Sequence, residues 1–165
     1  MTELHKRARQ VMAAGEALGL DVRVREFGKD EARTAADAAR SLGCEVDQIV
    51  KSLVFVVDTA PVLVLCSGGR RVDVVKVGNL FGSPAVRKAD AAEVRAATGF
   101  AVGGIPPFGH TREMTVLMDG RLEDFATVWA AAGTPRHVFP LTPDELRKAT
   151  GAALADVTLD DDIPG

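Results

Sequence analysis

Several residue types that often carry chemistry are scarce or missing in this sequence. The chain has no tyrosine, one tryptophan and three histidines, and it has two cysteines. Cys44 and Cys66 fit neither a disulfide framework nor the spacing of a metal site. A secreted, disulfide-stabilised domain is therefore not indicated, and we expect both thiols to be small core residues in a reducing compartment.

The sequence also lacks a strong charge imbalance and a long apolar run. The net charge is -3, so the totals alone demand no polyanionic partner. Charged residues at positions 3, 6, 7 and 9 leave no room for the apolar region of a signal peptide. The longest apolar stretches are interrupted by glycine or proline before they reach the roughly 20 residues of a membrane helix. We expect a soluble, cytoplasmic protein.

The length and the apolar content suit one domain. The chain has 165 residues, of which 47% are hydrophobic, and it shows no linker or repeat. We expect residues 1–165 to form a single domain with a tail that is frayed from about residue 158. Periodicity and caps predict helices over 3–18, 34–42, 72–80, 90–99 and 142–151, and strands over 22–25, 49–57, 62–66, 114–118, 126–131 and 136–141.

Short turns join several of these strand pairs. Such connections favour antiparallel neighbours, whereas a doubly wound parallel sheet needs a long crossover after each strand. The sequence therefore predicts an α+β fold with a mixed, mainly antiparallel sheet and helices packed around it.

The stretch QIVKSLVFVV, residues 48–57, predicts a strand with two apolar faces. Lys51 shares one face with Ile49, Leu53 and Phe55. An ammonium group that is removed from water without a partner is costly, so this lysine needs an explanation. Its stem can lie along the sheet with the charged end in water at the beginning of the strand, or the lysine can serve a site.

The loop GGIPPFGH, residues 103–110, is the second unusual stretch. Gly103 and Gly104 allow a close approach of the backbone to a ligand, and Pro106 and Pro107 stiffen the second half of the loop. A rigid loop with exposed amides can stabilise a developing oxyanion, although a tight structural turn explains the same residues.

The third stretch is MTVLMDGRL, residues 114–122, in which an apolar strand ends at Asp119. This carboxylate is either the first residue of a turn or a partner for the buried lysine. No activated nucleophile is evident, because neither cysteine has a histidine pattern beside it. Of the histidines, only His110 borders the glycine-rich loop, where it either packs or supports a pocket.

Taken in order, these stretches resemble the YbaK/ProX family of aminoacyl-tRNA deacylases, which is related to the editing domain of bacterial prolyl-tRNA synthetases. The likeness spans nearly the whole chain. The matching stretches are TAADAARSLG (34–43), QIVKSLVF (48–55), GGIPPFG (103–109), MD (118–119) and AAGTPRHVFPLTPDEL (131–146). The resemblance implies a pocket over a curved sheet and hydrolysis of the ester that joins a mischarged amino acid to the terminal ribose of tRNA.

The resemblance also implies roles for individual residues. Lys51 would be the lysine that the reaction needs, and the amides of Gly103 and Gly104 would hold the ester carbonyl. Asp119 would close the pocket, and Thr34 would lie near its mouth. The full set of implied substrate-binding residues is Thr34, Ser52, Ile105, Pro106, Phe108 and Asp119. A substrate group or a bound water would attack, and no metal or cofactor is expected.

Contact with tRNA is expected to be electrostatic. Arg70, Arg71 and Lys76 are the predicted contacts with acceptor-stem phosphates, together with Arg87 and Lys88, although part of this set consists of ordinary solvated charges. Some family members bear an aromatic hydroxyl near the pocket, and this chain has no tyrosine.

The resulting hypothesis is a trans-editing deacylase that acts on Cys-tRNA(Pro) or Ala-tRNA(Pro), with prolyl-tRNA synthetase as a further candidate partner. Two alternatives stay open. One is a non-catalytic module that binds an aminoacyl end or a nucleotide, and the other is a structural partner of a synthetase.

Overall fold

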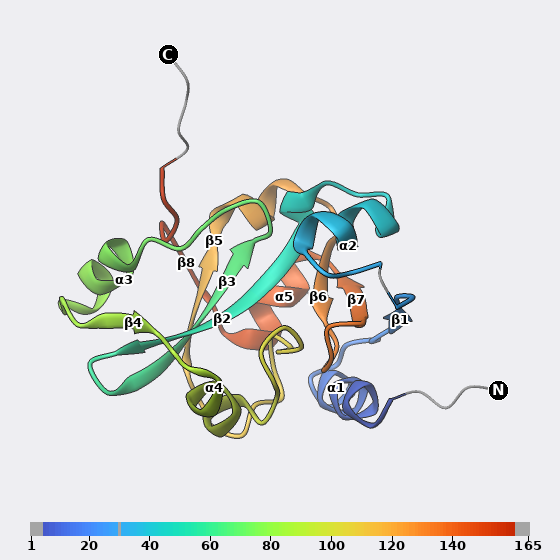
Figure 1. Cartoon of the computed structure of the whole chain (residues 1–165), viewed down its shortest axis with the longest axis horizontal. Coiled ribbons are helices and arrows are strands. Elements are labelled where there is room, and N and C mark those ends of the chain that lie inside the picture. The colour runs from blue at the N-terminus through green and yellow to red at the C-terminus, as the bar shows by residue number, and fades with distance from the viewer. Residues whose placement is uncertain (1–4, 30, 161–165) are drawn as a thin grey trace, which may run out of the picture.

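The computed structural model describes residues 5–29 and 31–160. They form one eight-stranded mixed sheet with helices around it, which confirms the predicted fold class (Figure 1). The strands are β1 (Arg25–Glu26), β2 (Ile49–Val57), β3 (Ala60–Ser67), β4 (Val86–Lys88), β5 (Thr115–Asp119), β6 (Val128–Ala131), β7 (His137–Leu141) and β8 (Ala153–Ala155). The helices are α1 (Lys6–Ala17), α2 (Ala35–Leu42), α3 (Val74–Phe81), α4 (Ala91–Thr98) and α5 (Pro143–Thr150), with 3-10 turns η1 (Val46–Gln48) and η2 (Gly120–Asp124).

The sheet order is β1-β7-β6-β2-β3-β5-β8, and β4 pairs with β2 outside this path. Among the described strands, four pairings are antiparallel and three are parallel. The predicted hairpins β2–β3 and β6–β7 are both present. None of the described helices is long and apolar enough to cross a membrane.

Helix ends lie where local chemistry predicts them. The Thr34 hydroxyl accepts a hydrogen bond from the Asp37 N–H at the start of α2, and Thr142 and Glu145 form a reciprocal capping box on α5. The first helix begins at Lys6, and the predicted positions 3 and 4 lie outside the described residues.

Short strands and the tail were not predicted correctly. β4 and β8 have three residues each, which is too short for a periodic signal. The prediction of a frayed tail from residue 158 is wrong for residues 158–160. Thr158 is buried and pairs with Val72, and the Leu159 N–H donates to the Arg71 carbonyl. This pairing depends on a segment far away in the sequence, and residues 161–165 lie outside the described part of the chain.

Both faces of β2 are buried, as its sequence predicts. Val50, Val54 and Val56 belong to the core cluster on one face. Phe55 and Val57 belong to the cluster on the opposite face, which also contains Cys66 and Val77. The strand is therefore a central element with little room for a charged side chain.

One edge of β2 is only partly paired. On its β3 side the strand is paired from Val50 to Val57. On the other side β6 pairs with residues 49–50 and β4 pairs with residues 55–57, so that neither of these two strands pairs with residues 51–54. We call this interruption the notch. It places Lys51 and Ser52 where the sheet edge is open.

Candidate active site

A cavity of about 300 Å³ lies against the notch. Its walls come from α2 and the residues before it, from β2, from β4 and α4, from the loop that follows α4, and from β6, β7 and the turn between them. Figure 1 shows these elements grouped around β2. Five of the residues predicted for the site line this cavity, namely Thr34, Lys51, Ser52, Gly103 and Ile105. Tertiary folding thus brings three distant sequence segments to one place.

Lys51 lies at the notch and is half-buried. Its Nζ donates a hydrogen bond of 2.5 Å to the carbonyl oxygen of Arg70. Its cross-strand neighbour in the β2–β3 ladder is Cys66. The amine is therefore held by a neutral backbone dipole, and its positive charge is not cancelled by that partner.

Asp119 does not provide the ion pair that the sequence suggested for this lysine. It is 3% exposed and accepts hydrogen bonds from the N–H groups of Ser67 at 3.2 Å and Arg121 at 3.0 Å. The Arg70 guanidinium lies 3.9 Å from its Oδ1. Asp119 does not line the cavity. It instead fixes the segment 67–70, whose last carbonyl receives the Lys51 hydrogen bond.

Asp47 holds the same segment from η1. Its Oδ1 accepts the Gly69 N–H at 2.9 Å, and its Oδ2 lies 3.0 Å from Arg121 Nε. Its carbonyl oxygen accepts the Ser67 hydroxyl hydrogen. A Cβ atom on Gly68 would lie 2.3 Å from the Val46 carbonyl oxygen, so a larger residue does not fit there. The sequence reasoning missed Asp47 and Arg121, because only the Gly68–Gly69 pair hinted at such a close approach.

Fewer residues of the glycine-rich loop line the cavity than its sequence suggests. Gly103, at φ +89°, lines the cavity. The Gly104 N–H donates to the Ala101 carbonyl oxygen at 3.1 Å, so this amide is engaged within the loop. Pro106 and Phe108 do not line the cavity. Phe108 packs in the core, where its ring centroid lies 5.7 Å from that of Phe139.

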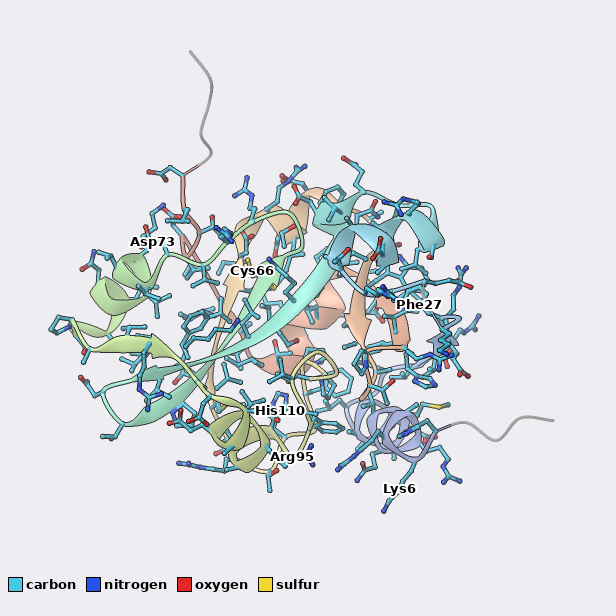
Figure 2. All side chains as sticks on the ribbon, in the orientation of Figure 1. Lys6, Phe27, Cys66, Asp73, Arg95 and His110 are labelled. Carbon is cyan, nitrogen blue, oxygen red and sulfur yellow. The ribbon has the colours of Figure 1, made fainter. Side chains whose placement is uncertain are left out.

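His110 is the last residue of this loop and contacts an earlier part of it. Its Nε2 lies 2.6 Å from the Pro106 carbonyl oxygen, within the connection between α4 and β5 (Figure 2). Burial lowers the pKa of His110, while the contact with the Pro106 carbonyl acts in the opposite direction. Of the two neutral tautomers, the one with its proton on Nε2 can donate to the carbonyl.

Neither cysteine has the environment of a nucleophile. Cys66 is fully buried, and burial raises its pKa to about 11 even though Lys51 acts to lower it (Figure 2). Burial also raises the pKa of Cys44. Both thiols are therefore protonated near neutral pH. Cys66 is a core residue, as expected, whereas Cys44 is only half-buried.

The charges around the cavity are positive. Arg33 and Lys88 line it together with Lys51, and no lining residue is an Asp or Glu among those the structure describes. Arg70, Arg71 and Lys76 do not line it. The Lys76 ammonium lies on α3, where it contacts Asp156 at 3.0 Å and Asp160 at 2.7 Å. Arg33 was missed by the sequence reasoning, which read the segment before Thr34 only as a helix start.

Metal-binding groups are not gathered here or elsewhere in residues 5–29 and 31–160. No cluster of three or more His, Cys, Asp or Glu side chains in these ranges could hold an ion. The fold and the cavity define a small mixed α/β protein with a binding site at an interrupted sheet edge.

Comparison with known proteins identifies the family. The model of the aminoacyl-tRNA editing domain matches residues 29–149, and the chain belongs to this family. A solved structure described as that of a proposed trans-editing enzyme for prolyl-tRNA synthetase superimposes with a TM-score of 0.91 at 45% sequence identity. The match covers 95% of this chain and 99% of that one.

Two curated relatives have a similar length. An uncharacterised protein of Bacillus subtilis, YwhH, is 36% identical over 124 residues, which are 74% of this chain and 78% of the relative. The Enterococcus faecalis protein EbsC, named as a proposed Cys-tRNA(Pro)/Cys-tRNA(Cys) deacylase, is 27% identical over 135 residues, 81% of this chain and 82% of EbsC. A proline–tRNA ligase of Streptococcus equi is 29% identical over 80% of this chain, and the match spans 21% of that larger protein.

Proposed function

We propose that this chain is a trans-acting aminoacyl-tRNA deacylase that hydrolyses mischarged tRNA, with Cys-tRNA(Pro) or Ala-tRNA(Pro) as substrate. The observation that carries the proposal is the cavity that brings Lys51 and Gly103 together in a member of the aminoacyl-tRNA editing family. The names of EbsC and of the solved trans-editing structure point to the same activity.

The electrostatics of the cavity support a ligand that carries phosphate. Lys51, Arg33 and Lys88 all contribute to its lining, and no lining residue in the described part of the chain is an Asp or Glu. The acceptor end of tRNA brings phosphates, which a positive field attracts. The volume of about 300 Å³ suits a small acyl group and little more of the nucleotide.

The chemistry needs charge stabilisation more than a nucleophilic side chain. A water molecule, oriented by the protein or by a substrate hydroxyl, adds to the carbonyl carbon and gives up a proton, and negative charge develops on the carbonyl oxygen. The bond to the ribose oxygen then breaks as that oxygen takes a proton. An ammonium group and a loop amide can stabilise the oxyanion in a site from which water is partly excluded. Lys51 and the Gly103 backbone are the groups that fit these two roles.

Two finer statements belong to this proposal. The cytoplasm, where tRNA is charged, is the compartment we propose. Prolyl-tRNA synthetase is a proposed partner, since the editing relatives include proline–tRNA ligases.

A deacylation panel tests the proposal. We expect the wild-type chain to release at least one small amino acid from Cys-, Ala-, Ser-, Thr- or Pro-charged tRNA faster than buffer does. Lys51→Ala is expected to slow that release strongly. If charged tRNA binds but none of the esters is hydrolysed faster than in buffer, the chain is a binding module and the enzymatic proposal is wrong.

A further inference from the structure

The cavity has an apolar side with one hydroxyl in it. On β2, Ser52 lies between Val50 and Val54 on one strand face, and both valines belong to the core cluster that also contains Val94 and Ile105. All five residues line the cavity. A hydroxyl among aliphatic side chains needs a hydrogen-bond partner, because water cannot replace one there without space and further polar groups.

The Ser52 hydroxyl lacks such a partner in the part of the chain that the structure describes. Its Oγ is buried, and no hydrogen-bonding atom of residues 5–29 and 31–160 lies within reach of it. Most buried polar side-chain atoms in folded proteins are hydrogen-bonded, so an exception in the wall of a cavity points to a missing ligand.

The Ser52 backbone is also open to the cavity. The Ala89 N–H donates to the Val54 carbonyl, so Val54 directs its backbone groups toward the β4 side of β2. Alternate residues of a strand direct their N–H and C=O groups to the same edge, so those of Ser52 face this side as well. Neither β6 nor β4 pairs with residue 52. Side chain and backbone of Ser52 therefore both offer polar groups at the notch.

We propose that Ser52 is the specificity-determining residue of the site, whose hydroxyl hydrogen-bonds the γ atom of the acyl side chain. The inference rests on the proposed function and goes beyond it by naming the preferred acyl group. That group is a small side chain with a thiol or hydroxyl at the γ position. It occupies the apolar side of the cavity, while the ribose and its phosphate stay near Arg33 and Lys88.

Matched acyl groups test this role. Seryl and 2-aminobutyryl groups have nearly the same size, but only the seryl group has a hydrogen-bonding γ atom. We expect the wild-type chain to hydrolyse seryl- or cysteinyl-tRNA more efficiently than 2-aminobutyryl-tRNA. Ser52→Ala should lower kcat/KM for the seryl and cysteinyl esters about tenfold, the effect of one hydrogen bond, and change that for the 2-aminobutyryl ester by less than about twofold.

A second pair of variants separates the effect of the hydroxyl group from the effect of side-chain volume. Threonine and valine have nearly the same volume, so Ser52→Thr should keep the preference for a polar γ atom and Ser52→Val should lose it. Thermal unfolding is the control for a structural role. Because Ser52→Ala removes an unpaired buried hydroxyl, its melting temperature should equal or exceed that of the wild type.

Binding of stable analogues separates the two proposals. Adenosine that carries the amino acid through a 3′-amide cannot be hydrolysed, so its dissociation constant reports recognition alone. We expect the seryl analogue to bind the wild-type chain more tightly than the 2-aminobutyryl analogue, with the difference lost in Ser52→Ala. Such a preference without any hydrolysis would defeat the enzymatic proposal and leave the role of Ser52 intact. Three results would overturn the role of Ser52. They are equal binding of both analogues by the wild-type chain, an equal loss of kcat/KM for all esters in Ser52→Ala, or a clearly lower melting temperature of Ser52→Ala.

Discussion

Lys51 Nζ on β2 donates a hydrogen bond to the Arg70 carbonyl oxygen, which follows the end of β3. The acceptor is a neutral dipole whose position is set by Asp119 and Asp47 through the segment 67–70. A carboxylate would cancel the charge of the ammonium group, whereas a carbonyl leaves most of its field available to a ligand.

Removing the Lys51 charge should therefore affect catalysis more than folding. We expect Lys51→Met, which keeps the apolar stem, to lower the deacylation rate by about 100-fold or more, as the loss of an oxyanion-stabilising group does. Lys148→Met is the matched control, because Lys148 lies on α5, pairs with Asp144 and does not line the cavity. Single-turnover deacylation gives the rates, and similar rates for both variants would contradict the role of Lys51.

The Asp119 carboxylate should matter for the stability of the fold. Asp119→Asn weakens the hydrogen bonds to the Ser67 and Arg121 amides at a buried position, and we expect a loss of about 1–3 kcal/mol in the free energy of unfolding. Asp124→Asn removes an exposed ion pair with Arg121 and should cost less than about 1 kcal/mol. Urea unfolding compares the two, and equal losses would refute a special role of Asp119.

The two loop glycines should respond differently to alanine. A Cβ atom on Gly104 would lie 2.6 Å from Thr134 Cα and 2.8 Å from the Gly133 carbonyl oxygen, so backbone must move. On Gly103 the nearest atom would be Pro135 Cγ at 3.4 Å, and the cost comes from its positive φ, about 1–2 kcal/mol. We expect Gly104→Ala to lower the melting temperature more than Gly103→Ala. The reverse order in calorimetry would disprove this packing argument.

The partly buried His110 should make the free energy of unfolding depend on pH. Burial lowers its pKa in the folded protein, so the unfolded chain binds more protons as the pH falls. The stability present above the ordinary histidine value of about 6.5 should then decrease as the pH drops through that value and toward the folded pKa. His110→Asn should show a smaller decrease in unfolding free energy between about pH 7.5 and about pH 5. Because burial also lowers the pKa of His137, only the difference between wild type and variant reports on His110.

Much of the fold could be predicted from local patterns. The caps at Thr34 and Thr142 and the apolar run of β2 each depend on neighbouring residues, and all three were located correctly. The three-residue strands β4 and β8 were missed because each is defined by its partner strand. The start of the tail was misjudged for the same reason. Thr158 pairs with Val72 and Asp160 with Lys76, and both partners lie far away in the sequence.

Some of the predicted site residues line the cavity and others do not. Lys51, Ser52, Thr34, Gly103 and Ile105 were named from sequence stretches and their family resemblance, and they line one cavity. Their chemical roles remain predictions. Asp119, Pro106 and Phe108 belong to the same stretches but do not line the cavity, because a motif fixes order along the chain and not the direction of each side chain.

The family, the helix ends and a lysine on an apolar strand can be read from the amino-acid sequence alone, because each depends on short stretches of neighbouring residues and their order along the chain. Three other features required the folded chain: β4 and β6 stop short of residues 51–54, Arg70 supplies the acceptor for Lys51, and Ser52 keeps a hydroxyl without a partner among the described residues. These features arise where separate segments meet, and the packing of those segments sets them.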